Sequence, residues 1–173
     1  GLVLIVGLAD PAAAGCTDSP KPKVDWTGCS KPQLMLSKDD LSGANFTKAG
    51  LTSTDFTGSK LAGAKLVEAE LSYARFIGAD LSGADLTRAA AWRANFTQAT
   101  FDKANLAFAN MSRSVFAHAR FAGANLTKSE MNRSDFTGAE LSGVDLSKAE
   151  LARVVFANAK LSGVNFAAAN LAR

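Results

Sequence analysis

The chain has 173 residues, of which 19 are Lys or Arg and 16 are Asp or Glu, so its formal net charge is only +3. That length suits one domain. The charge is far below the basic excess of a dedicated nucleic-acid-binding protein, so we expect no nucleic acid as a partner. One histidine and two cysteines are too few for a His-based catalytic centre or a Cys/His metal site. The composition therefore predicts a protein that is not an enzyme and holds no cofactor or metal.

Residues 1–14 resemble the end of a secretory signal peptide. The first nine residues are apolar and too few to span a bilayer. Ala12, Ala13 and Ala14, followed by Gly15, supply the small residues of a cleavage site. We therefore interpret 1–14 as a signal-peptide remnant and expect an exported protein of a bacterial periplasm with no transmembrane span. An apolar segment packed onto the domain is the alternative.

Residues 15–38 hold both cysteines and three of the four prolines, and we interpret them as an N-terminal cap. Export permits a disulfide between Cys16 and Cys29, and closing such a loop is worth about 3 kcal/mol. The loop and Trp26 are expected to cover the first unit of the domain that follows. The alternative is a lipoprotein with a lipid on Cys16, because the residues from Ala13 to Cys16 partly match a lipobox. The leucine usual at the first position of that motif is Ala13 here.

From Asp39 onward the sequence repeats every five residues. Of 27 central positions i, from Leu41 to Leu171, 26 hold Leu, Phe or Met, and Ala91 is the exception. Position i−2 is Ala in 18 repeats, i−1 is Asp or Asn in 13, and i+1 is Ser or Thr in 14. A helix would rotate successive i residues by about 140°, and a flat strand would alternate them between its faces. A coil with one pentapeptide per side buries every i residue, so the repeat predicts stacked coils.

Two columns of residues predict four sides and about 20 residues in each coil. Sorting the i positions by steps of 20 gives an unbroken column of six phenylalanines, from Phe56 to Phe156. At i+2 of the first side, Gly recurs from Gly43 to Gly163, as a corner with positive φ favours. Lys103 interrupts the glycine column and predicts a different turn there. No proline follows Pro32, in keeping with sides that donate backbone hydrogen bonds to the next coil.

The motif A-(D/N)-(L/F)-(S/T)-x, as in Ala44-Asn45-Phe46-Thr47-Lys48, resembles the pentapeptide-repeat proteins over about 133 of the 173 residues. The resemblance implies an all-β fold, a right-handed quadrilateral β-helix. The columns predict the same fold without its handedness. We expect this solenoid to span 39–173, where 27 repeats make just under seven coils.

The positions i−1, i+1 and i+2 face outward, so a binding site is expected among them. The i+2 column of the third side begins with Ser53 and Tyr73 and continues as an arginine ladder, the candidate site for an anionic partner: Arg93, Arg113, Arg133, Arg153 and Arg173. The i−1 column of that side carries three acids expected to neutralise part of the ladder: Glu70, Glu130 and Glu150. A solvated charged surface is the alternative.

Two other outward residues are distinctive. His118 has no spacing that would complete a catalytic triad, so we interpret it as an exposed surface residue. Trp92 follows Ala91, which leaves an underfilled core position, and Met111 one coil on has an adaptable side chain that fits the space. Trp92 itself is either a patch over that position or part of a contact surface.

We therefore expect an exported, non-enzymatic structural or protein-interaction rod whose partner is an unknown protein or an anionic molecule. Some pentapeptide-repeat proteins protect DNA gyrase by mimicking DNA. That alternative needs a negative surface, whereas 41–173 holds 15 Lys or Arg and 11 Asp or Glu, a net +4. A signal segment would also direct the protein to a compartment other than that of DNA gyrase. The repeat runs to Leu171, so we expect the C-terminal coil to pair in a homodimer, with a missing C-terminal segment as the alternative.

Overall fold

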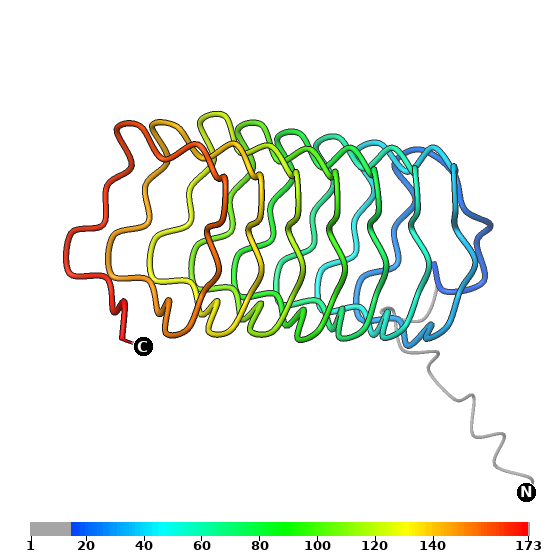
Figure 1. Ribbon diagram of the computed structural model, residues 1–173. Helices are drawn as coiled ribbons and strands as arrows, with labels where there is room; N and C mark the ends of the chain where they lie inside the picture. Colours follow the sequence, from blue (N-terminus) through cyan, green and yellow to red (C-terminus); the bar gives the residue numbers. More distant parts are fainter. Residues whose placement is uncertain (1–14, 173) are drawn as a thin grey trace, which may run out of the picture.

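The protein is a rod of stacked coils (Figure 1). A computed structural model describes residues 15–172; the proposed signal remnant 1–14 and Arg173 of the ladder lie outside these residues. Within 15–172 there is no helix, and from Lys21 on every five residues contribute one turn and one bridge. The bridges are parallel and join residues 20 apart, from Asp25 with Asn45 to Glu150 with Asn170.

Four bridges occur in every 20 residues, so each coil has four sides. We number the sides by their bridge residues. The first side has bridges at 40, 60 and so on to 160, and the second at 25, 45 and so on to 165. The third side has them at 30, 50 and so on to 170, and the fourth at 35, 55 and so on to 155. The turn that follows each side forms a corner of the coil.

The backbone hydrogen bonds explain why a five-residue unit stacks. In the unit 41–45, the N–H groups of Leu41 and Gly43 donate to carbonyls of the following coil at 2.8 and 2.9 Å. The N–H of Asn45 donates to the preceding coil at 2.8 Å, and that of Ala44 closes the turn on the carbonyl of Leu41 at 3.0 Å. Four of the five N–H groups are thus paired within the backbone, as buried chain requires.

Where i−1 is Asp or Asn, the fifth N–H, at i+1, is paired by that side chain, which explains the polar part of the motif. The N–H and the hydroxyl of Thr57 both donate to Oδ1 of Asp55, and the same arrangement recurs between Thr97 and Asn95. The Thr57 hydroxyl, and less strongly its N–H, lower the pKa of the Asp55 carboxyl, while partial desolvation raises it. Asp or Asn at i−1 therefore accepts the hydrogen bonds that Ser or Thr donates at i+1, where the corner begins.

Every corner has the same turn, whichever residue occupies it. A positive φ recurs at i+2 from Lys23 to Ala168, in ten glycines and in twenty other residues. The prediction of a different turn at Lys103 is wrong: its φ is 60°, beside 64° at Gly83, and each N–H donates to the next coil at 2.8 Å. The stacking hydrogen bonds fix the corner conformation, so glycine relieves strain there without determining the turn.

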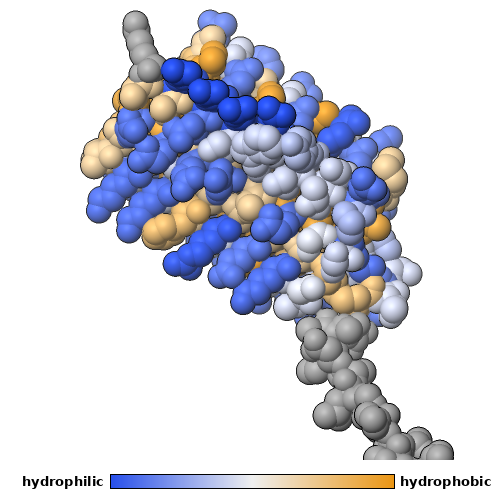
Figure 2. All heavy atoms as spheres, turned by 90° about the horizontal axis from the view of Figure 1, so that it is seen from below, coloured by the Kyte–Doolittle hydropathy of each residue, from blue (hydrophilic) through white to orange (hydrophobic). Residues whose placement is uncertain are grey.

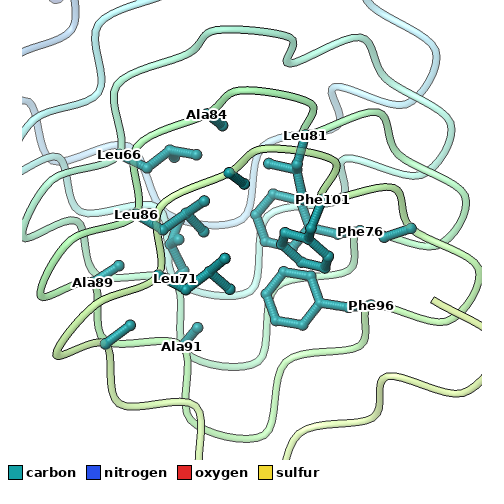
Figure 3. Close-up of a cluster of buried hydrophobic side chains, with 14 of the residues drawn as sticks. Leu66, Leu71, Phe76, Leu81, Ala84, Leu86, Ala89, Ala91, Phe96 and Phe101 are labelled. Atoms are coloured by element: carbon teal, nitrogen blue, oxygen red, sulfur yellow. The ribbon is translucent and has the colours of Figure 1, made fainter. Parts of the chain in front are cut away.

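Side chains at i and i−2 fill the interior, and Figure 3 shows leucines and phenylalanines pointing inward from successive coils. The predicted phenylalanine column is confirmed: neighbouring rings from Phe56 to Phe156 stack at centroid distances of 4.6 to 5.5 Å. A shorter stack joins Phe101 and Phe121 at 4.9 Å. Buried hydroxyls at i−2 are paired too, since Ser59 Oγ donates to the carbonyl of Phe56 at 2.6 Å.

The coil begins earlier than the repeat motif does. The bridges at Asp25, Ser30 and Met35 lie inside 15–38, the segment that we assigned to a separate cap. Trp26 occupies an i position of this first coil, is 1% exposed and contacts the Phe46 ring at 5.5 Å, so it is a core residue and not a cover as we expected. The motif is hidden because the next i position holds Lys31, whose Nζ lies 4.5 Å from the centroid of the Trp26 ring.

Residues before the first coil lie against its N-terminal end. Cys16 and Cys29 are joined by a disulfide with a Cα–Cα distance of 5.5 Å. The indole N–H of Trp26 donates to the carbonyl of Asp18 at 3.2 Å. Gly15 lies so close to the Asp25 carbonyl that a Cβ would clash with its oxygen. This packing admits no larger residue at position 15.

Candidate interaction surface

Long side chains gather at two of the four corners. We call Arg93, Arg113, Arg133 and Arg153 the arginine column; all four are exposed at the corner after the third side, with φ between 56° and 61°. Each backbone N–H donates to the following coil, at 2.8 to 3.1 Å. The backbone therefore holds the four Cα atoms in line at the coil spacing of about 4.8 Å, while the guanidinium groups face solvent.

The arginine column is not neutralised by acidic neighbours. Among the described residues, none of its four guanidinium groups lies within 4 Å of a carboxylate oxygen. The expectation that the acids of the third side pair with it is wrong. Glu130 instead accepts a hydrogen bond from Asn110 Nδ2 at 2.9 Å, and Glu150 accepts one from Asn170 Nδ2 at 2.7 Å. These carboxylates bond along their own i−1 column and leave the arginines unpaired.

Aromatic rings contact the arginine column instead. The Cζ atoms of Arg93 and Arg113 lie 4.3 and 5.8 Å from the centroid of the Trp92 ring. The edge of that ring meets Tyr73 in a T-shaped contact at 5.2 Å, and Tyr73 is 47% exposed. All the ring contacts of Trp92 are thus with surface residues, which favours the contact-surface interpretation over a patch on Ala91.

A second cationic and aromatic column was missed in the sequence. We call Arg88, Phe108, Lys128 and Lys148 the mixed column; they are exposed at the corner after the second side. Phe108 is 45% exposed, with Arg88 Cζ at 5.3 Å and Lys128 Nζ at 4.8 Å from its ring centroid. Sorting the i+2 positions of the second side by steps of 20, as was done for the third, would have revealed it.

The two columns border the same side of the rod. The third side lies between them, because Arg88 precedes and Arg93 follows the side at 89–91. We call this surface, with both bordering columns, the third face. On one face of the molecule, Figure 2 shows hydrophilic side chains in rows along the rod, with more hydrophobic side chains between them. The third face thus has unpaired cations along both edges.

The first side, opposite, has the reverse character. Toward the C-terminus its charges pair with each other: Arg120 contacts Asp102 at 2.9 Å and Glu140 at 3.9 Å, and Lys160 contacts Glu140 at 2.8 Å. The hydrogen bond and charge of Lys160 lower the pKa of the Glu140 carboxyl. Most corners after this side are glycines, so few long side chains stand above it. Between Arg88 and Arg153, the cations without an ion pair among the described residues all belong to the third face, except Lys103.

The remaining polar groups of residues 15–172 do not assemble a cluster that could hold a metal ion. No three His, Cys, Asp or Glu side chains of that segment are placed to hold a metal ion. His118 is exposed, and its imidazole lies over Gly138 of the next coil, where a Cβ would stand 2.6 Å from Nδ1. In the part of the chain that the structure describes, no helix is long and apolar enough to cross a membrane.

Comparison with known families gives one consistent result. The family model described as pentapeptide repeats (8 copies) matches residues 36–63, 51–88 and 79–116, and the pentapeptide repeat region model matches residues 109–173. Together these matches extend over residues 36–173. A search of curated proteins found no match.

Solved structures of repeat proteins are similar to this chain. HetL, a pentapeptide repeat protein involved in heterocyst differentiation regulation from the cyanobacterium Nostoc sp. strain PCC 7120, is 23% identical over 87% of this chain and 89% of its own, with a TM-score of 0.38. A pentapeptide repeat protein from the Arabidopsis thaliana thylakoid lumen is 30% identical over 69% and 70%, with a TM-score of 0.30. QnrB1, a plasmid-mediated fluoroquinolone resistance protein, is 19% identical over 86% and 87%, with a TM-score of 0.30.

Proposed function

Because the chain belongs to the pentapeptide-repeat family, whose fold is a scaffold for outward side chains, we propose that it is an exported, non-enzymatic interaction rod. Its binding site is the arginine column, Arg93, Arg113, Arg133 and Arg153, and its partner carries a row of anionic groups. The observation that carries this proposal is that four aligned guanidinium groups have no carboxylate within 4 Å among the described residues. Guanidinium groups bind carboxylates and phosphates through paired N–H donors, so an unpaired row suits a polyanion.

Export to a periplasm is part of the proposal. It rests on the composition of 1–14 and on the pairing of Cys16 with Cys29, since disulfides persist in oxidising compartments. The disulfide and a lipid on Cys16 exclude each other, and the 5.5 Å Cα–Cα distance favours the disulfide. The right-handed sense of the coil, just under seven coils for 39–173, and a homodimer through the C-terminal coil belong to the proposal as well.

DNA mimicry, the alternative function, has less support. A mimic of DNA needs rows of negative charge, whereas residues 41–173 have a net charge of +4. The rows of acids in the third face are interrupted by Ala90 and Asn110 and bordered by arginine. We therefore propose that the partner is anionic, and not a DNA-binding protein that would recognise a mimic of DNA.

The test is to reverse the charge of the column. In the variant with Arg113→Glu and Arg133→Glu, binding of a labelled oligoglutamate, measured by fluorescence anisotropy, is expected to fall at least tenfold, because attraction becomes repulsion at two adjacent coils. Binding by the unmodified protein should also weaken as salt is added. Both positions are exposed, so the free energy of unfolding should change by no more than about 0.5 kcal/mol.

The matched control has the same change in net charge elsewhere on the rod. Lys65→Glu with Arg75→Glu alters exposed residues of the second and fourth sides. This control is expected to bind the oligoglutamate within about twofold of the unmodified protein, since neither residue belongs to the arginine column and salt weakens the effect of exposed charges outside a contact. An equal loss in both double variants would mean that net charge alone attracts the probe, and would refute the arginine column as a site.

A further inference from the structure

The third face offers a more specific site than a row of arginines. We propose that an extended acidic segment of a partner protein binds across the two coils where the arginine column and the mixed column face each other, between Arg88 and Arg93 and between Phe108 and Arg113. The proposal rests on the proposed function, because it names the partner class and the location of the same interaction.

The floor of this site carries no acidic group. The two coils bridge at Ala90 and Asn110, which are the central outward residues of the side between the columns. Ala90 leaves room above the backbone, and Asn110 is neutral and donates to Glu130. A carboxylate of a bound segment above Ala90 therefore meets Arg88 and Arg93 at the two edges and no acidic side chain between them, while Glu70 and Glu130 border the floor in the adjoining coils.

The neighbouring coils on both sides are less suitable for an anion. Toward the C-terminus, Glu130 and Glu150 occupy the centre of the face. Toward the N-terminus, Glu70 occupies the centre, and Glu68 at the corner pairs with Lys48 at 3.7 Å. Like charges placed about 4 Å apart repel by about 1 kcal/mol even in water. The acids thus confine the site to the two coils at Ala90 and Asn110.

The aromatic rings hold the cations in place without neutralising them. Arg93 stacks on Trp92, and Phe108 has Arg88 on one side and Lys128 on the other, at 4.3, 5.3 and 4.8 Å from the ring centroids. A guanidinium stacked on a ring keeps its N–H donors directed outward at the edge. Trp92 and Phe108 are therefore positioning residues, and they reduce the side-chain entropy lost when a carboxylate binds.

The composition and the size of the site indicate a protein segment in extended form. Trp, Tyr and Arg are the residue types most enriched where proteins contribute binding energy. The strip between the columns is about 10 Å wide and, over the two coils, about 10 Å long, from the rise of a strand and the spacing of coils. That area is well below the ~800 Å² per partner of a globular interface, so a single extended chain fits it.

The test introduces a carboxylate on the floor. Ala90→Glu is expected to weaken binding of the labelled oligoglutamate about tenfold, because the new charge lies between the cations of both columns. Glutamate at 70, 130 and 150 already occupies this column, so the substitution suits the fold. The control is Gly50→Glu in the same column, where the nearest atom to a new Cβ is Ser30 Cα at 3.6 Å, an ordinary contact. This control should bind as the unmodified protein does.

The role of Trp92 is tested separately. Trp92→Leu should weaken binding several-fold, and Trp92→Phe should restore most of it, while both variants keep the melting temperature of the unmodified protein. Equal binding by all three proteins would refute the positioning role.

The outcomes separate the two proposals. Loss in the Arg113 and Arg133 double variant together with full binding by Ala90→Glu would keep the arginine column and overturn the site on two coils. No binding of oligoglutamate, oligogalacturonate or polyphosphate by the unmodified protein would overturn both. Binding of an oligogalacturonate or a polyphosphate but not of oligoglutamate would keep an anionic partner and overturn a protein segment as that partner.

Discussion

Phe96→Ala tests the phenylalanine column, which is the principal support of the core. Phe96 is fully buried at the middle of the rod. Its ring stacks on Phe76 at 4.8 Å and on Phe116 at 5.0 Å, and it meets Phe101 edge-on at 5.3 Å. Truncation to alanine therefore removes contacts in three coils at once and leaves a cavity between two stacked rings.

The expected cost is at the upper end of the usual range. Phe→Ala in a core costs about 3–5 kcal/mol, and each aromatic pair adds about 0.5–1.5 kcal/mol beyond burial. Since the hydrogen bonds between coils fix the backbone on both sides of the cavity, the surrounding coils have little freedom to collapse into it. We therefore expect a loss of about 4–5 kcal/mol in the free energy of unfolding.

Urea denaturation followed by far-UV circular dichroism measures this loss, with two variants as controls. Phe156→Ala removes a half-buried ring that stacks only on Phe136, at 5.5 Å, and meets Phe166 at 6.2 Å, so it should cost clearly less. Arg113→Ala alters an exposed corner and should change stability by about 0.5 kcal/mol or less. Equal losses for Phe96→Ala and Arg113→Ala would refute the assignment of inward and outward columns.

Two more predictions concern the polar structure. The pKa of Asp55 is lowered in the folded protein, chiefly by the Thr57 hydroxyl. The stabilising contribution of this carboxylate is therefore complete above the unfolded pKa of about 3.9 and is lost as the pH falls through the folded pKa. Asp55→Asn keeps the acceptor and should flatten the acid-induced loss of stability in pH-dependent urea melts, whereas an unchanged pH profile would refute the assignment. For the N-terminal end, thiol titration of the exported, unfolded protein should find no thiol, and its intact mass should show no lipid on Cys16; two reactive thiols would refute the disulfide.

The repeat made most of the fold predictable from the sequence. The Leu, Phe and Met side chains at i identify the inward column, and the phenylalanines spaced 20 residues apart from Phe56 to Phe156 reveal the period of the coil. The start of the solenoid was not predictable in the same way, because Lys31 stands where the motif expects an apolar residue. The Nζ of Lys31 lies 4.5 Å from the centroid of the Trp26 ring, a contact that stabilises the cation at this position. That contact depends on three-dimensional neighbours and has no signature at a single position.

The candidate interaction surface was predictable only in part, for a related reason. The arginine column follows from counting by 20, but whether its charges are paired depends on where neighbouring side chains turn. Glu130 is close in sequence to Arg133, yet it bonds to Asn110 of the preceding coil at 2.9 Å. Likewise, Phe108 stands out from the sequence only when Arg88 and Lys128, twenty residues to either side, are brought next to it. Distances between coils, and not spacing along the chain, decide which charges remain available.

The conformation of the corners explains why the arginine column and the mixed column could take on the proposed binding role without affecting the fold. Twenty corner residues other than glycine hold a positive φ, and each such residue costs about 1–2 kcal/mol relative to a conformation that suits it. The backbone hydrogen bonds are made equally well with glycine, as Gly83 and Lys103 show with the same 2.8 Å bond. Long cationic and aromatic side chains at the second and third corners therefore contribute nothing that the turn requires. Because the fold does not require these side chains on the two corners that border the third side, their concentration there supports a role in binding.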